Sequence, residues 1–306
     1  MAQSSSLNIS SFRLNEDQKK EFKNYLEKKR SSLVPSNKEI LESVIKKNKN
    51  TIFDYLSNDK ISDTILFLRE EAYTTLLEKE AIFNGIVFRE IGKKFGIRNS
   101  KIKHLADVFF EFNATNKGIF FEKLMETFGN YTEIMGPYLY SFCVSNTQAN
   151  RSRAGATFEN IIYYLYNYFS YSFASQSVVK NEIKKVFGKS NNSSSPVDSI
   201  LPGIEEFRQC PEEVIIGSIK TTLRERWQEV VEEKHRLGVN SIYLLTVDGT
   251  MSEKKLQQIS EMGIVLVVLK EIKNRECFKR NLDVIDFEEY FLEKIPKVFN
   301  FWRKDA

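Results

Sequence analysis

The sequence predicts an α/β protein whose mixed central sheet is flanked by helices and preceded by a helical N-terminal region. Apolar residues recur at helical spacing through most of the first half, whereas apolar strand-like runs alternate with helices after Thr147. The run at 264–270 is almost continuously apolar, which is typical of a central strand covered on both faces. We therefore expect a helical region over 1–147 and a core over 148–306.

In the first region, Asn15-Glu16-Asp17-Gln18 has the composition of a helix start, and Phe22, Tyr25 and Leu26 follow at helical spacing. Pro35-Ser36-Asn37 marks the turn after this helix. Further helices are expected at 38–45, 61–80, 81–95, 102–112 and 119–128. No helical segment in this region carries a recognisable functional motif.

In the second region, the order of strands and helices predicts the topology of the sheet. Strands at 214–220, 241–247 and 264–270 alternate with helices, so we expect parallel neighbours joined by right-handed crossovers. The other expected elements are helices at 151–171, 181–187, 223–237, 253–262 and 287–301 and strands at 172–179 and 197–201.

Composition limits the classes of function. Lys and Arg total 45 against 41 acidic residues, a net charge of +4, so the chain is not a polycationic nucleic-acid coat, although a local basic cleft remains possible. Three scattered cysteines and two histidines argue against a disulfide scaffold, a zinc site or a histidine-rich centre. Any metal would be held by oxygen ligands. The absence of a secretory signal and of a long apolar span predicts a cytoplasmic protein.

One constellation has the composition of a metal-dependent nuclease site. Lys220 ends an apolar strand, Asp198 starts the preceding one, and Glu233 follows on the next helix. Carboxylates can hold a divalent metal that stabilises phosphate charge, while a lysine orients the attacking water. The spacing differs from the usual Pro-Asp form because Val197 separates Pro196 from Asp198.

The same residues also allow a purely structural interpretation. A lysine at a strand end is common in α/β proteins, Asp198 can be a turn residue, and Glu233 can belong to a solvated helix face. A second segment supports the nuclease hypothesis, because Arg151 and Arg153 begin a helix and can meet phosphate. Glu159 follows on that helix, where its carboxylate can join a metal site.

Three segments together resemble one group of enzymes. Arg153-Ala154-Gly155 with Glu159, then Asp198, then Ile219-Lys220-Thr221-Thr222 with Arg224-Glu225-Arg226-Trp227 are similar in order and type to its signature. The group is the type II restriction endonucleases related to EcoRII, PspGI and SsoII. The likeness covers roughly 151–270, and residues 1–140 have no recognisable match.

The resemblance implies a PD-(D/E)xK core that cuts double-stranded DNA with Mg²⁺ and leaves 5'-phosphate ends. Asp198 and Glu233 would ligate the metal, Lys220 would assist the water, and Glu159 would be an additional acidic member of the catalytic site. The residues expected to read C·G pairs are Arg224, Glu225 and Arg226, by hydrogen bonds of Arg to guanine and Glu to cytosine. Those expected at the DNA backbone are Arg151, Arg153, Thr221 and Thr222.

The resemblance also implies a target and partners. The group's palindromic sites contain a CC/GG core of the CCGG, CCNGG or CCWGG type. A palindrome matches a two-fold protein, so we expect a homodimer, with a tetramer also possible. A companion methyltransferase acting on the same site, without forming a stable complex, and a bacterial or archaeal cytoplasm are implied as well.

Two alternatives remain open from the sequence. A structure-selective repair or transposon nuclease would share the core but cut branched or nicked DNA, and the Arg-Glu-Arg segment at 224–226 argues against it. A non-catalytic DNA-binding protein with a nuclease-like fold is the other, and the intact acidic residues and Lys220 argue against that. Residues 1–140 taken alone also fit a helical scaffold.

Overall fold

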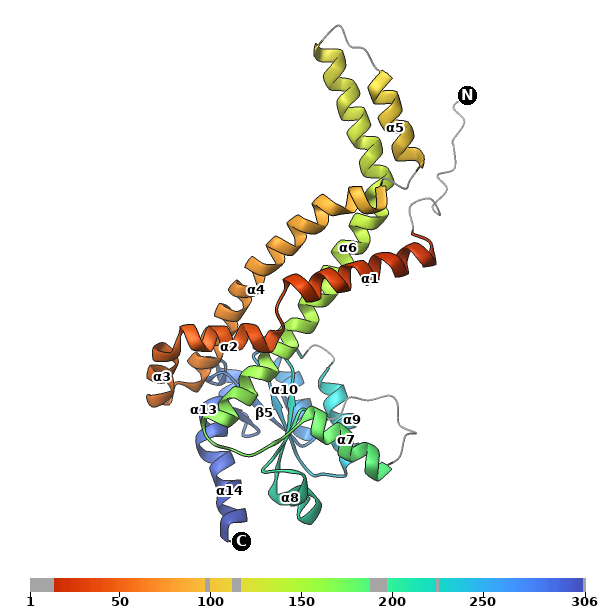
Figure 1. The fold of residues 1–306 in the computed structure, drawn as a ribbon. Coiled ribbons are helices and arrows are strands. Elements are labelled where there is room, and N and C mark those ends of the chain that lie inside the picture. The colour runs from red at the N-terminus through yellow and green to blue at the C-terminus, as the bar shows by residue number, and fades with distance from the viewer. Residues whose placement is uncertain (1–13, 97–99, 112–116, 188–196, 224–225, 305–306) are drawn as a thin grey trace. The chain divides into compact units, whose positions relative to one another are not determined.

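The computed structural model describes residues 14–96, 100–111, 117–187, 197–223 and 226–304 (Figure 1). The chain groups into two compact units. The helical unit comprises Met1–Ser36 and Thr74–Ser152, and the sheet unit comprises Asn37–Tyr73 and Arg153–Ala306. Residues Asn37–Tyr73, which the sequence assigns to the helical N-terminal region, therefore group with the sheet.

The helical unit is built on a cluster of aromatic rings. Phe22 packs edge-on against Phe95 and Tyr138, at centroid distances of 5.1 and 5.3 Å. Asn15 and Gln18 form the capping box that starts the first helix, as the sequence predicts. The helical segments of this unit are α1 (Glu16–Leu33), the second part of α4 (Ile61–Ile91), a π-helical turn (Gly92–Gly96), α5 (Ser100–Glu111) and the first part of α6 (Lys117–Tyr168).

Two expected helix boundaries are wrong. The predicted helices 61–80 and 81–95 form one helix, α4, since neither Gly nor Pro interrupts the chain at their junction. The predicted helices 119–128 and 151–171 both belong to α6, which continues through Pro137. A proline removes one backbone donor but need not end a helix whose other bonds and packing persist. None of the described helices is both long and apolar enough to cross a membrane.

The sheet unit contains a six-stranded mixed sheet with strands in sequence order. β1–β2 and β2–β3 are antiparallel, whereas β3 to β6 are parallel neighbours. The strands are β1 (Ala174–Ser175), β2 (Ser199–Leu201), β3 (Ile215–Ile219), β4 (Ile242–Leu245), β5 (Ile264–Val268) and β6 (Val284–Asp286). The parallel arrangement predicted for β3, β4 and β5 is confirmed.

Helices surround this sheet (Figure 1). They are α2 (Asn37–Lys47), α3 (Lys49–Ser57), the first part of α4, the second part of α6, α7 (Gln176–Phe187), α8 (Ile204–Gln209), α9 (Trp227–Leu237), α10 (Glu253–Glu261), α11 (Lys270–Lys273), α12 (Glu276–Lys279), α13 (Phe287–Glu289) and α14 (Ile295–Lys304), with single turns at Pro211–Glu213 and Tyr290–Lys294. All five residues of β3 are buried, as expected for a strand covered on both faces. The sequence missed β6, and the strand expected at 172–179 is only β1 before α7 begins.

A glycine allows the two strands that carry the site to approach closely. Gly217 in β3 pairs with Ser199 in β2. A Cβ at Gly217 would lie 2.4 Å from the Ser199 hydroxyl oxygen, so any larger residue forces the buried serine to move. The Ser199 hydroxyl lies 3.4 Å from the Tyr166 hydroxyl, which itself lies 2.8 Å from that of Tyr290. These three hydroxyl groups lie on one face of the sheet. The side chains of the residues next to Ser199 and Gly217 in the strands point to the opposite face.

One buried serine joins three segments of the sheet unit. The Glu288 carboxylate accepts hydrogen bonds from the Ser62 amide (2.9 Å) and hydroxyl (2.7 Å). The same hydroxyl accepts a hydrogen bond from the Lys270 amide at 2.9 Å. Ser62 is only 4% exposed, so water cannot replace these partners.

Replacing Ser62 with Ala should therefore lower the free energy of unfolding by about 1–3 kcal/mol, because the Lys270 amide and the Glu288 carboxylate lose the hydroxyl of a buried serine as a partner. Urea denaturation followed by circular dichroism measures the change. Ser57→Ala is the matched control, since its exposed hydroxyl bonds only to the Asp54 carbonyl in its own helix. Equal stabilities of the two variants would contradict this interpretation.

Candidate functional site

The pairing of β2 with β3 brings two sequence-predicted residues together. Asp198 immediately precedes β2, and Lys220 immediately follows β3. Because the strands are antiparallel and the Asp198 amide donates to the Gly217 carbonyl at 2.9 Å, the start of one lies beside the end of the other. Side chains alternate between the faces of a sheet, so Asp198 and Lys220 emerge on the same face as Ser218.

Asp198 and Lys220 form a buried ion pair. The Lys220 ammonium lies 3.0 Å from Asp198 Oδ2, and their side chains are each 5% exposed. The same oxygen accepts a hydrogen bond from the Ile219 amide at 2.6 Å. The Lys220 amide in turn donates to the Leu245 carbonyl of β4 at 2.9 Å. A buried pair of charges is tolerated only when such hydrogen bonds satisfy the remaining polar atoms.

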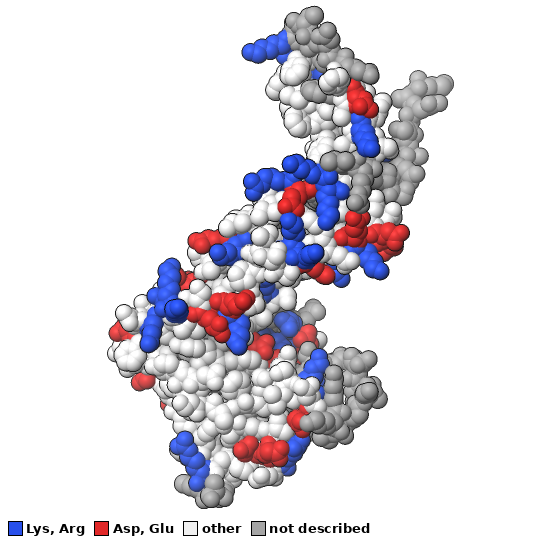
Figure 2. Space-filling model, viewed as in Figure 1, with Lys and Arg blue, Asp and Glu red and all other residues white. Residues whose placement is uncertain are grey.

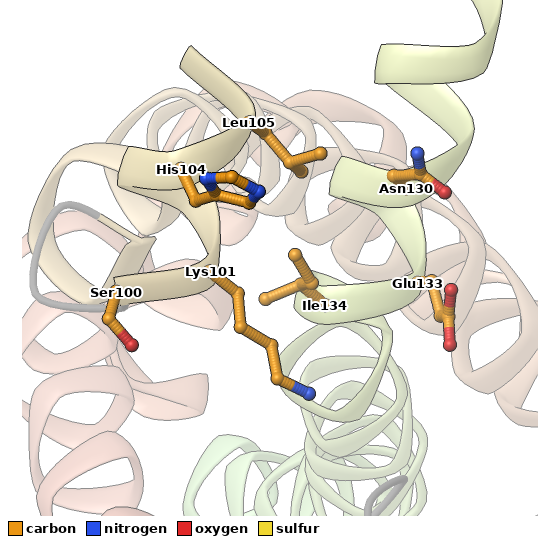
Figure 3. A pocket seen from close by; sticks show the side chains of 7 residues that line it. All are labelled: Ser100, Lys101, His104, Leu105, Asn130, Glu133 and Ile134. Carbon is orange, nitrogen blue, oxygen red and sulfur yellow. The ribbon is translucent and has the colours of Figure 1, made fainter. Parts of the chain in front are cut away.

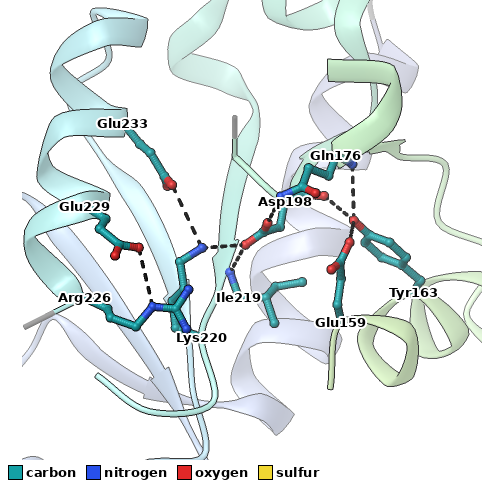
Figure 4. A network of polar contacts seen from close by, with 9 residues as sticks. All are labelled: Glu159, Tyr163, Gln176, Asp198, Ile219, Lys220, Arg226, Glu229 and Glu233. Carbon is teal, nitrogen blue, oxygen red and sulfur yellow. Dashed lines mark hydrogen bonds and ion pairs between the residues drawn. The ribbon is translucent and has the colours of Figure 1, made fainter. Parts of the chain in front are cut away.

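Glu233 brings a second carboxylate to the same lysine. Its Oε1 lies 4.0 Å from the Lys220 ammonium, and the residue is 3% exposed (Figure 4). Helix α9 presents Val230 and Glu233 inward and ends at Gly238, whose φ of 66° suits glycine. The alternative in which Glu233 lies on a solvated face is therefore wrong.

The Glu233 carboxyl is under-satisfied. Among the described residues, neither its Oε2 nor the neighbouring Ser218 hydroxyl makes a well-formed hydrogen bond, although the Ser218 hydroxyl is near enough to lower the pKa of the Glu233 carboxyl. Burial raises the pKa of Glu233 above its ordinary value, and the favourable charge of Lys220 offsets only part of this. A buried carboxylate oxygen without a well-formed hydrogen bond is unusual in native proteins, and a bound cation would satisfy it.

Tyr163 and Gln176 support Asp198 from the other side, and sequence reasoning missed both. Gln176, the first residue of α7, donates from its side-chain amide to Asp198 Oδ1 at 2.7 Å. The Tyr163 hydroxyl lies 2.7 Å from Glu159 Oε1 and also within bonding distance of the Asp198 carbonyl (Figure 4). Both oxygens of the Asp198 carboxylate thus have fixed partners. No local pattern marks these residues, since the contacts join separate elements.

Glu159 lies near the cluster without bonding directly to it. Burial raises the pKa of its carboxyl, and the charge of Asp198 acts in the same direction, although the Tyr163 hydroxyl and Lys220 oppose the shift. Burial, with the charge of Glu159, also raises the pKa of Tyr163 far above that of a free phenol, so its hydroxyl remains protonated. Glu159 therefore shares its electrostatic environment with Asp198 and Lys220.

Two of the three predicted base-reading residues, Arg224 and Glu225, lie outside the described residues. Arg226 is exposed, and its Nε lies 3.5 Å from a carboxylate oxygen of Glu229 one helical turn later. Its amide donates to the Leu223 carbonyl at 2.5 Å, which fixes its backbone beside a fully buried leucine. Arg226 is therefore a surface cation whose backbone is anchored in the core.

The predicted contacts to the DNA backbone are dispersed. Thr221 is half-buried and Thr222 is exposed, both directly after Lys220. Arg151 is exposed on the part of α6 that belongs to the helical unit. Arg153 is half-buried in the sheet unit, and its carbonyl accepts a hydrogen bond from Asn37 at 3.0 Å. Only the two threonines are adjacent in sequence to the acidic cluster.

A separate pocket of about 520 Å³ lies between α5 and α6 in the helical unit (Figure 3). Its polar lining includes Lys101, His104 and Glu133. In the described part of the chain, no three His, Cys, Asp or Glu side chains are arranged to hold a metal ion. This pocket therefore lacks the ligands of a metal centre.

The donor set around Lys220 nevertheless fits a magnesium ion. Mg²⁺ needs only one or two protein carboxylates, because water and substrate phosphate supply its remaining oxygen ligands. Asp198 and Glu233 flank the Lys220 ammonium, and Glu233 Oε2 has no partner among the described residues. The single positive charge of this ammonium can offset only one of the two carboxylate charges.

Comparison with known proteins identifies relatives of this chain. The family described as EcoRII C terminal matches residues 112–291, which is more than half of the chain. The type II restriction enzyme SsoII of Shigella sonnei is 37% identical over 152 residues, covering 50% of this chain and 48% of that protein. This chain thus spans about half the length of that curated relative.

Solved structures give the same result. A structure of metal-depleted Ecl18kI in complex with uncleaved, modified DNA is similar with a TM-score of 0.72 and 25% identity, over 95% of this chain and 86% of the other. The restriction endonuclease PspGI in complex with substrate DNA has a similar fold, with a TM-score of 0.58 and 20% identity, over 87% and 94% of the two chains. The predicted fold and resemblance are confirmed, and the chain belongs to the EcoRII C-terminal family of restriction endonucleases.

Proposed function

We propose that this chain is a type II restriction endonuclease that cuts both strands of DNA at a short palindromic site with Mg²⁺. The observation that carries the proposal is the buried cluster of Asp198, Lys220 and Glu233 at the strand ends of a restriction-endonuclease fold. The target we propose contains a CC/GG core of the CCGG, CCNGG or CCWGG type, and the products carry 5'-phosphates.

In this proposal Asp198 and Glu233 hold Mg²⁺. The ion would supply charge stabilisation for the phosphate and lower the pKa of a bound water. Lys220 extends between the two carboxylates, so its ammonium can orient the attacking water and offset negative charge on the phosphate. The low exposure of all three side chains strengthens these electrostatic effects, because little water screens them.

Gln176 and Tyr163 would act as positioning residues. The Gln176 amide and the Ile219 amide hold the two oxygens of Asp198, which limits the orientations of its carboxylate. Glu159 would contribute further negative charge, with the Tyr163 hydroxyl fixing its carboxyl at 2.7 Å. Such support matters because a metal site depends on the orientation of its ligands as well as their identity.

Recognition of the target is assigned to the segment that follows Lys220. Arg224 and Arg226 would donate paired hydrogen bonds to guanine O6 and N7, and Glu225 would accept from cytosine N4. Arg151, Arg153, Thr221 and Thr222 would contact phosphates. Basic and acidic side chains are interspersed on the face seen in Figure 2. Contacts of basic side chains with phosphates position the protein on DNA but do not read its sequence.

The first test is digestion of a sequenced plasmid with Mg²⁺, followed by sequencing of the ends. We expect one short palindromic site in the wild type and a loss of at least about a hundredfold in rate for Lys220→Ala, because the transition-state charge loses its counterion. Specific DNA binding in Ca²⁺ should survive, and Lys254→Ala, an exposed lysine on α10, should cut normally.

Three outcomes would contradict this assignment. Normal cleavage by Lys220→Ala would remove the lysine from the site. Faster cleavage of branched or nicked DNA than of any palindrome would indicate a structure-selective nuclease. Specific binding without cleavage in any divalent metal would indicate a DNA-binding protein with a nuclease-like fold.

Cleavage should also fall as the pH decreases, with a midpoint above the pKa of a solvated glutamate. Burial raises the pKa of Glu233, so its carboxylate takes up a proton at a higher pH and then cannot bind a cation. Because protons and Mg²⁺ compete for this carboxylate, raising the Mg²⁺ concentration should shift the midpoint to lower pH. Rate against pH at two Mg²⁺ concentrations measures this, and a midpoint independent of Mg²⁺ would contradict it.

We further propose that two copies bind a palindrome together, because a two-fold target matches a two-fold protein. An apolar face on α6 supports this. Phe121, Met125 and Phe128 share one side of the helix and are 61%, 52% and 56% exposed, which is unusual for a surface without a partner. A tetramer of such dimers is a further possibility, and a methyltransferase of the same specificity would protect the DNA of a bacterial or archaeal host.

Sedimentation velocity tests the dimer at micromolar concentration. We expect the wild type to sediment as a dimer and Phe121→Ser to shift toward the monomer, because the serine removes apolar area from the contact. Phe53→Ser, which alters a residue 64% exposed on α3, should leave the dimer intact. A monomeric wild type, or a fully dimeric Phe121→Ser variant, would overturn this assignment.

A further inference from the structure

The loop after β4 contains a carboxylate with an unusually complete set of partners. Asp248 Oδ1 accepts hydrogen bonds from the Thr250 amide (3.0 Å) and hydroxyl (2.6 Å). Its Oδ2 accepts from the Leu223 amide at 2.8 Å. The Asp248 amide itself donates to the Thr246 hydroxyl at 3.1 Å. The contacts with Thr246 and Thr250 are those of an ordinary turn, whereas the contact with Leu223 crosses 25 residues of sequence.

In the sequence, Leu223 lies midway between the lysine proposed for cutting and the arginine proposed for base reading. It is fully buried, three residues after Lys220 and three before Arg226. Its carbonyl accepts the Arg226 amide at 2.5 Å, and its own amide is held by Asp248. Lys220 is held separately, since its amide donates to Leu245 in β4. Strand β4 and its following loop thus fix the connection from β3 to α9 at two points.

The loop that carries Asp248 is itself held in place by contacts with the segment that follows β5. The Arg275 guanidinium donates to the Gly249 carbonyl at 2.9 Å. A Cβ on Gly249 would lie 2.8 Å from that guanidinium and 3.1 Å from Ile272, so the loop lies tightly against its neighbours. Asp248 therefore presents its carboxylate from a fixed backbone.

The charge of Asp248 strengthens its hold on Leu223. Burial alone would raise the pKa of this carboxyl, but hydrogen bonds from Thr250 and the Leu223 amide bring it below its ordinary value. The group is therefore ionised at neutral pH. Hydrogen bonds to an ionised acceptor are roughly twice as strong as neutral ones, and the Leu223 amide belongs to a fully buried residue.

We propose that Asp248 is a positioning residue for target recognition. It holds Leu223 in place and thereby fixes the base-reading Arg226 relative to Lys220. The inference rests on the proposed function. In this inference, Asp248 keeps the arginine that reads the bases in a fixed position relative to the lysine that assists cutting. If Leu223 shifted, Arg226 would move with it, whereas Lys220 would stay bound to β4. Loss of Asp248 should therefore relax the choice of sequence more than it slows cleavage of the correct site.

The test compares kcat/KM on the target with kcat/KM on sites that carry one substituted C·G pair. Asp248→Ala should lower this ratio by about tenfold, within the discrimination that one base contact supplies, with kcat on the target within about threefold of wild type. Asp248→Asn should restore most of the ratio, because its amide oxygen can still accept from Leu223. Asp54→Ala is the matched control, since it removes an exposed carboxylate on α3, and it should leave the ratio unchanged.

Hydrogen–deuterium exchange of peptides spanning 221–226 gives a readout independent of activity. Asp248→Ala should speed exchange there, and Asp248→Asn and Asp54→Ala should not. An unchanged ratio in Asp248→Ala, or an equal fall in rate on every site, would overturn this inference alone. Absence of cleavage by the wild type would overturn the proposed function and this inference with it. If Asp248→Ala does not fold, Asp248→Asn decides, because an altered ratio without faster exchange would contradict the positioning role.

Discussion

The buried ion pair between Asp198 and Lys220 is the interaction on which the rest of the site depends. It joins the start of β2 to the end of β3. The Ile219 amide and the Gln176 side chain donate further hydrogen bonds to the Asp198 carboxylate. Removing one partner of such a pair costs about 3–5 kcal/mol, because the other charge stays buried and uncompensated. The two residues must therefore be present together, and β2 and β3 must keep their register. In that register Gly217 pairs with Ser199, where any larger residue would force the serine hydroxyl to move.

The parallel part of the sheet explains why the residues proposed for cutting and for reading lie near one another. Lys220 and Asp248 follow the carboxyl ends of β3 and β4, and the ends of parallel strands meet at one edge. The chain leaves that edge through Leu223 and enters α9, which returns Glu233 to the lysine. A single crossover thus carries the lysine proposed for catalysis, the segment proposed for recognition and a second carboxylate. The lysine also depends on a contact with β4, and the recognition segment on a contact with the loop that follows β4.

Much of the sheet unit follows from its sequence. Apolar runs of β3 and β5 and the helices between them predict parallel neighbours, because a strand covered on both faces has no polar alternation. The spacing of Asp198, Lys220 and Glu233 predicts one site, and the structure brings the three together. The predicted roles of these residues remain predictions. The ends of the long helices are predicted less well than the sheet. No local sequence pattern shows that packing allows α4 and α6 to continue past the predicted ends.

By itself the sequence determined the α/β class, the order of the parallel strands, the acidic residues with their lysine and the family likeness, because periodicity and motif spacing are local properties of the chain. Only the tertiary structure decided that Glu233 faces inward, that Gln176 and Tyr163 hold Asp198 and Glu159, and that Asp248 holds Leu223. These are contacts between side chains and backbone groups on different elements. Their geometry is fixed by packing of the sheet unit, to which no single stretch of sequence corresponds.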